Sequence, residues 1–95
     1  MKTLKEIRVE RIIEKLLQLM RVEACGMSQM VDAVKEGLVQ PKRAIKSFKN
    51  RASRFICLSN RYDKLVKAYN FKDNESSRYY NSLHQDFDEM VVFFS

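Results

Sequence analysis

A run of positively charged side chains, uninterrupted by any acidic one, lies near the middle of the chain. The stretch "PKRAIKSFKNRASRF", residues 41–55, carries six Lys and Arg residues, and no Asp or Glu occurs from residue 37 to residue 62. Cations at this density suit contacts with the phosphates of nucleic acid. A helix face that is merely solvated usually interleaves Glu with Lys, because the two pair at i and i+4. The run therefore favours a surface that binds a polyanion, with a solvated helix face as the alternative.

Apolar and charged side chains separate within this run when a helix is assumed. At about 100° per residue, one arc holds the apolar residues Ile45, Phe48, Ala52, Phe55 and Ile56. The adjoining arc and its borders carry the residues that we predict to bind nucleic acid, namely Lys42, Arg43, Lys46, Lys49, Asn50, Arg51, Ser53 and Arg54. The cations would neutralise phosphates, while Arg43 and Asn50 are candidates for base edges. We therefore predict binding to nucleic acid, with double-stranded DNA as the first choice.

The residues before this helix resemble a helix-turn-helix unit. Ala33 and Gly37 are four residues apart, and in that motif a small residue lets two helices approach while a Gly makes the turn. The pattern predicts such a unit over residues 28–57, with the helix that begins at Pro41 entering the major groove.

A shorter resemblance concerns the third helix of a homeodomain. The eight residues "FKNRASRF" are similar to that helix in the order of Phe48, Asn50 and Arg51. The chain has no Trp for the core position that the family uses. The resemblance therefore implies a similar helix chemistry, with Asn50 and Arg51 turned toward DNA, and not membership of the family.

The elements that must hold the basic helix are also helical by pattern. Two Gly and one Pro leave few breaks, and Thr3 followed by Glu6 forms a capping box at the start of the first helix. Gly26, Gly37 and Pro41 mark further helix boundaries. We expect helices over residues 3–26, 28–37, 41–57 and 60–71 and from about 78 nearly to the C-terminus; the third and fourth could equally form one helix bent at 59 and 60. The fold class predicted is all-α: a single small domain, residues 1–95, built as an orthogonal bundle of four to five short helices.

Composition sets the expected location and excludes several kinds of protein. The net charge of +6 suits polyanionic partners, and two Cys are too few for a disulfide scaffold. The N-terminus lacks the apolar region of a signal peptide, and no stretch approaches the roughly 18 apolar residues of a membrane span. We expect a soluble cytoplasmic protein without a membrane partner.

Catalytic and metal-binding motifs are missing from the sequence. Cys25, Cys57 and His84 are the only soft metal ligands, and they are widely spaced without a Cys-x-x-Cys pair. No glycine loop for phosphates, paired carboxylates or nucleophile motif occurs. We therefore expect no enzyme activity, no metal and no cofactor.

The aromatic C-terminus supports a rival function. Tyr79, Phe93 and Phe94 are the aromatic residues least needed by a core, so we predict that they contact a partner or a second copy in a homodimer. The rival is a small helical adaptor or inhibitor that acts on another protein, such as a nucleic-acid-processing enzyme, through the basic helix or the apolar C-terminus. The acids of the last helix could lie across the basic helix, or the two faces could never meet; these acids are Asp86, Asp88 and Glu89.

Overall fold

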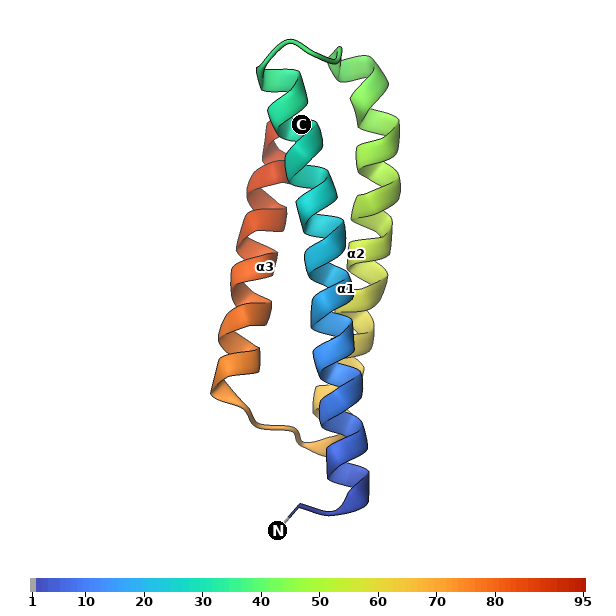
Figure 1. Ribbon diagram of the computed structural model, residues 1–95, viewed down its shortest axis with the longest axis vertical. Helices are drawn as coiled ribbons and strands as arrows, with labels where there is room; N and C mark the ends of the chain where they lie inside the picture. Colours follow the sequence, from blue (N-terminus) through green and yellow to red (C-terminus); the bar gives the residue numbers. More distant parts are fainter. Residues whose placement is uncertain (1) are drawn as a thin grey trace.

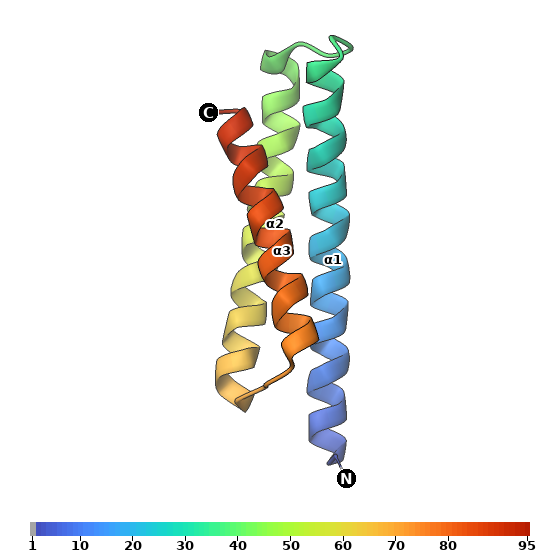
Figure 2. The ribbon, with the colours of Figure 1, turned by 90° about the vertical axis from the view of Figure 1, so that its left-hand side faces the viewer.

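Three long helices make up nearly the whole molecule. The computed structural model describes residues 2–95 and contains α1 (Leu4–Lys35), α2 (Pro41–Tyr69) and α3 (Asn74–Phe93). The helices run up, down and up along a molecule of 53 × 20 × 17 Å (Figures 1 and 2). Thirty-two residues of α helix extend about 48 Å, so α1 alone spans most of the long axis. The prediction of an all-α fold is confirmed.

Local signals in the sequence set the helix ends. The Oγ1 of Thr3 accepts a hydrogen bond from the backbone N–H of Glu6 at 3.2 Å, as the capping box predicts. Gly37 takes a positive φ of 76°, its N–H bonds to the carbonyl of Val34, and the next N–H bonds to the carbonyl of Ala33. These are the two hydrogen bonds of a Schellman ending, which satisfy the last carbonyls of α1. Pro41 then opens α2 at the first helical position, also as predicted.

The expectation of four to five short helices was wrong because two predicted pairs each form one continuous helix. Gly26 does not end the first helix; it lies buried in the middle of α1, where the side chain of Arg51 covers it. The predicted helix over residues 28–37 is the last part of α1. Residues 59 and 60 likewise lie within α2, which is the single long helix that the pattern left open.

The orthogonal bundle and the helix-turn-helix unit over residues 28–57 were also wrong. These residues form the end of α1, a short turn and the first half of α2, and the two helices run side by side in opposite directions (Figure 1). A helix-turn-helix needs its helices to cross at about 90–120°. The reason for the difference is the heptad-like spacing of buried side chains along each helix, which lengthwise contact satisfies over its full length. On α1 the buried side chains are Val9, Ile13, Leu16, Leu17, Met20, Ala24, Met27 and Val31, and on α2 they include Phe48, Phe55 and Tyr62.

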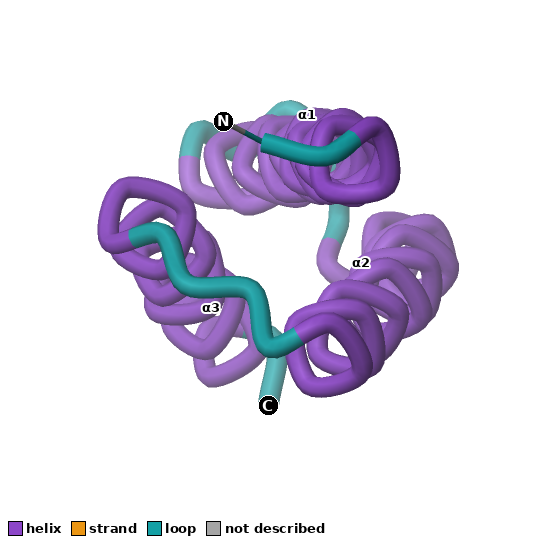
Figure 3. The backbone as a smooth tube through the Cα atoms, turned by 90° about the horizontal axis from the view of Figure 1, so that it is seen from below, coloured by secondary structure: helices purple, strands orange, loops and turns teal. Residues whose placement is uncertain are grey.

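One core runs along the common axis of the three helices. Seen from below, the helices stand at the corners of a triangle (Figure 3). The largest fully buried side chains are Ile13, Met20, Met27 and Phe55. Phe55 stacks on Phe87 of α3 with ring centroids 4.5 Å apart, and Tyr62 stacks on Tyr80 at 4.1 Å. These aromatic pairs attach α3 to α2. The side of each helix that faces away from the core is in contact with solvent.

Candidate nucleic-acid interface

Six of the eight side chains predicted to bind nucleic acid share the solvent side of α2. We call them the basic face: Lys42, Arg43, Lys46, Lys49, Asn50 and Ser53, all of them exposed. Their spacing of three and four residues keeps them on one side of the helix, while Ala44, Phe48 and Phe55 are buried on the other. The separation of charged and apolar arcs that the sequence predicts is therefore present, except that Ile56 of the predicted apolar arc is 47% exposed.

Arg51 and Arg54 point in a different direction, toward α1. The Nε of Arg54 donates to Oε2 of Glu23 at 2.8 Å, and Nη1 of Arg51 lies 3.6 Å from the other carboxylate oxygen. Arg51 is half-buried because its guanidinium lies over Gly26. These two cations thus join α1 to α2, and their charge is partly balanced by Glu23.

Further cations extend the basic face along the second half of α2. Arg61, Lys64 and Lys67 are exposed, and Lys67 lies 25 residues from Lys42, about 38 Å at 1.5 Å per residue. The predicted site missed them because the third helix was expected to end near residue 57. The charge of residues 41–72 already contained the signal, since this segment alone sums to +9.

The electrostatics of the basic face are set by the absence of nearby acids. Within residues 2–95, Lys42, Arg43, Lys46 and Lys49 form no ion pair, and no acid occurs in the first turn of α2. The N-terminus of a helix also carries partial positive charge from its unpaired N–H groups. The start of α2 therefore combines two sources of positive potential.

The acidic part of α3 does not pair with the basic face. Asp86 and Glu89 line a hollow of about 690 Å³ between α3 and α1, together with Arg21 and Tyr79. Within the described residues, the ion pairs of α2 both go to Glu23. The hypothesis that Asp86, Asp88 and Glu89 cover the cations thus gains no support from any contact.

The three aromatic residues predicted to bind a partner lie in different surroundings. Tyr79 is 39% exposed at the α1–α3 hollow. Phe93 is 38% exposed, with Nζ of Lys35 5.4 Å from the centroid of its ring. Phe94 is half-buried and packs on Phe48, with ring centroids 4.3 Å apart. Tyr79 and Phe93 are about 21 Å apart along α3, so the three rings do not form one patch.

A buried polar cluster between α2 and α3 was not anticipated from the sequence. The Oγ of Ser59 lies 2.6 Å from Nε2 of His84 and 2.7 Å from the hydroxyl of Tyr80. Burial raises the pKa of Tyr80, and Asp63 raises it further, while the hydrogen bond from Ser59 acts in the opposite direction. Ser59 is only 4% exposed, which denies a substrate access to this Ser–His pair. The cluster satisfies polar groups inside the bundle and fixes the register of α3 against α2.

The potential metal ligands are spread apart. Cys25 and Cys57 are free and exposed on different helices, whereas His84 belongs to the buried cluster. In the part of the chain that the structure describes, no three side chains of the metal-binding types gather at one place.

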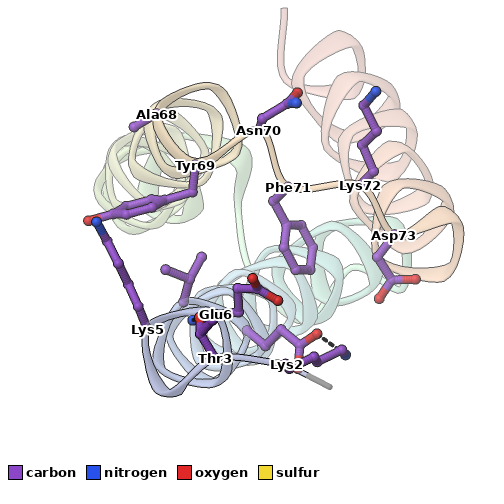
Figure 4. Close-up of a pocket in the computed structure, with 12 residues that line it drawn as sticks. Lys2, Thr3, Lys5, Glu6, Ala68, Tyr69, Asn70, Phe71, Lys72 and Asp73 are labelled. Atoms are coloured by element: carbon purple, nitrogen blue, oxygen red, sulfur yellow. Dashed lines mark hydrogen bonds and ion pairs between the residues drawn. The ribbon is translucent and has the colours of Figure 1, made fainter.

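A further hollow lies at the end of the molecule where α1 begins and α2 passes into α3 (Figure 4). Its volume is about 830 Å³, and its charged side chains are of both signs. Lys2 is hydrogen-bonded to Glu10, and Nζ of Lys5 lies 5.2 Å from the centroid of the Tyr69 ring. Two of its cations, Lys2 and Lys5, are therefore engaged by the chain itself, unlike those of the basic face.

Two findings concern the chain as a whole. Among residues 2–95, none of the three helices has an apolar stretch that could cross a bilayer. Comparisons with models of known protein families, with curated proteins and with solved structures find no match.

Proposed function

We propose that the protein binds nucleic acid, duplex DNA in the first place, as a non-enzymatic regulatory or accessory protein of the cytoplasm. The observation that carries the proposal is the basic face, whose cations are exposed on one side of one helix without an acid paired to them. The three helices of the protein share one core, so the protein would act as a single domain.

The residues of the basic face would divide the work by position. Lys42, Lys46 and Lys49 contact phosphates, and Lys64 and Lys67 extend these contacts along the duplex. Arg43 and Asn50 are the side chains whose geometry suits base edges. Arg51 and Arg54 contribute less, because Glu23 already holds them.

The shape of α2 supports binding dominated by phosphates. The major groove is about 12 Å wide and admits one helix, but it winds around the duplex whereas α2 is one continuous helix of 29 residues. Only a few turns of α2 can therefore lie deep in the groove, and the remaining cations meet the backbone. We expect strong dependence on salt and modest dependence on sequence.

A titration of a fluorescently labelled duplex at several salt concentrations tests the proposal. If five phosphates are contacted, the log of the binding constant should fall against log salt with a slope of about −4.5. Lys46→Glu with Lys49→Glu should abolish measurable binding at moderate salt. The matched control is Arg11→Glu with Lys15→Glu, which makes the same change in charge on exposed positions of α1.

The control variant separates a specific surface from general attraction. Equal losses in the two variants would mean that net charge alone attracts the duplex. No binding of the unaltered protein at low salt would reject the proposal and favour the rival, a protein-binding adaptor or inhibitor.

A further inference from the structure

A second apolar stripe runs along the contact between α1 and α2, outside the core. Two hollows follow one another there, of about 410 Å³ and 550 Å³, and no residue of α3 lines either. We call them together the α1/α2 groove. The apolar side chains along it remain substantially exposed: Leu19 is 42% exposed, Val22 59%, Ile12 49% and Tyr69 47%.

The spacing of this stripe is that of a helix-packing surface. Ile12 and Leu19 are seven residues apart on α1, and Leu58 and Leu65 are seven apart on α2. A heptad interval is what keeps side chains in contact with a neighbouring helix over several turns. On α1, Ile12 and Leu19 stay exposed outside the core, whereas Leu58 and Leu65 of α2 are half-buried, pack against the core and form the floor of the groove.

The groove has a cationic rim. Lys5 and Arg8 line it on α1, and Arg54 and Arg61 line it on α2. Its one acid, Glu23, is paired with Arg51 and Arg54, and Nζ of Lys5 lies over the Tyr69 ring. Among residues 2–95, the rim cations without an ion pair or a ring contact are therefore Arg8 and Arg61. An occupant must therefore combine an apolar stripe with acidic flanks.

The rim also argues against a second copy of the chain as the occupant. A two-fold dimer places the same patch against itself, so the rim cations of both copies would oppose one another. From Leu4 to Val22 the groove extends about 27 Å, which matches a helix of about 18 residues. We propose that the α1/α2 groove binds an acidic amphipathic helix of another protein, which lies along α1 and α2 as a fourth helix.

Cysteine protection tests the proposal because the two thiols differ in position. Cys57 lines the groove and Cys25 does not, and both are exposed. The probe is a synthetic helical peptide of about 18 residues, with Leu and Ile at heptad spacing and Glu on its flanks. At ten times its dissociation constant it should slow alkylation of Cys57 by about tenfold and leave the rate of Cys25 unchanged.

Two peptides and two variants make the result decisive. A peptide with Lys in place of every Glu should not protect Cys57. Leu19→Ser with Val22→Ser should abolish protection by the acidic peptide, and so should Arg8→Glu, while the far-ultraviolet circular dichroism stays unchanged because these positions are exposed. Lys46→Glu with Lys49→Glu, neither of which lines the groove, should lower duplex binding and leave protection of Cys57 by the acidic peptide intact, so the two proposals fail separately.

Three outcomes would overturn the inference. Equal protection by the acidic and basic peptides would remove the role of the rim, and failure of the acidic peptide to protect Cys57 would remove the helix site. Self-association in sedimentation that Leu19→Glu abolishes would assign the groove to a second copy instead.

Discussion

Gly26 of α1 lies directly beneath the guanidinium of Arg51 of α2. A Cβ built at residue 26 would lie 2.4 Å from Nη1 and 2.5 Å from Cζ of Arg51, so no other residue fits while Arg51 keeps its place. The three nearest atoms all belong to this flexible side chain and none to a backbone. Gly26 therefore leaves room for the Arg51 side chain of α2, although glycine inside a helix has a low helix propensity and destabilises it.

Replacing this glycine should stabilise the protein. Gly26→Ala gains about 1 kcal/mol of helix propensity, and it displaces a guanidinium whose contact with Glu23 is long and partly exposed. We expect a net gain of about 0.5 kcal/mol in the free energy of unfolding, measured by urea denaturation. A loss above about 1 kcal/mol would instead show that Arg51 cannot leave its position.

Charge reversal on the basic face should separate stability from binding. In Lys46→Glu the new carboxylate follows Lys42 by four residues, which replaces a like-charge pair with an opposite-charge pair. The free energy of unfolding should rise by about 0.3 kcal/mol, while the affinity for duplex DNA falls severalfold. Parallel urea denaturation and duplex titration of one sample measure both. Loss of stability would indicate that Lys46 supports the fold and does not serve a partner.

The Ser59 cluster predicts a double-mutant result. Ser59→Ala leaves Nε2 of His84 and the hydroxyl of Tyr80 without their shared partner, which should cost about 1–2 kcal/mol. Adding Tyr80→Phe should cost less than the same change in the unaltered protein, because the hydroxyl has then already lost its bond. Urea denaturation of the four proteins gives the coupling. Ser53→Ala, at an exposed position of the same helix, is the control and should be nearly neutral.

Alkaline pH should weaken the fold through Tyr62 and Tyr80. Burial raises the pKa of both phenols above the ordinary value of 10.0. Because the pKa of each phenol is higher in the folded state than in the unfolded chain, the protonated phenols favour the folded state. This contribution to stability is complete below about pH 10 and is lost as the pH rises through the folded-state pKa. The urea concentration at the unfolding midpoint should therefore decrease as the pH is raised from about 9 to 12, and the decrease should be smaller in Tyr80→Phe. Identical profiles for the two proteins would assign the alkaline loss to other groups.

Local signals predicted both ends of α1 and the start of α2, but not the start of α3, which begins at Asn74 and not near residue 78. The arrangement of the helices depends on contacts between distant residues, which local signals do not show. Thr3, Gly37 and Pro41 act through neighbours within four residues, so their roles follow from the sequence. Gly26 has the same residue type as a helix stop, but its role depends on Arg51, which lies 25 positions away. A distant partner of this kind is invisible in a local pattern.

The candidate site divides along the same line. The helical period of α2 was enough to place Lys42, Lys46 and Lys49 together on its outer side. It could not indicate that Glu23 would hold Arg51 and Arg54, because that contact needs α1 to lie alongside α2. The α1/α2 groove was hidden for the same reason, since Leu19 looks like an ordinary core residue until the structure shows it 42% exposed beside α2.

The unopposed cations of α2 also link folding to the surrounding electrolyte. Mutual repulsion along one helix disfavours the folded chain, and it weakens as mobile ions screen it within about 10 Å at 0.1 M. Raising the ionic strength should thus increase the free energy of unfolding, while it lowers the affinity for any bound polyanion. A bound polyanion that places its negative charges along this row should reduce the same repulsion at a far lower concentration than salt does. Its binding should therefore raise the melting temperature of the protein.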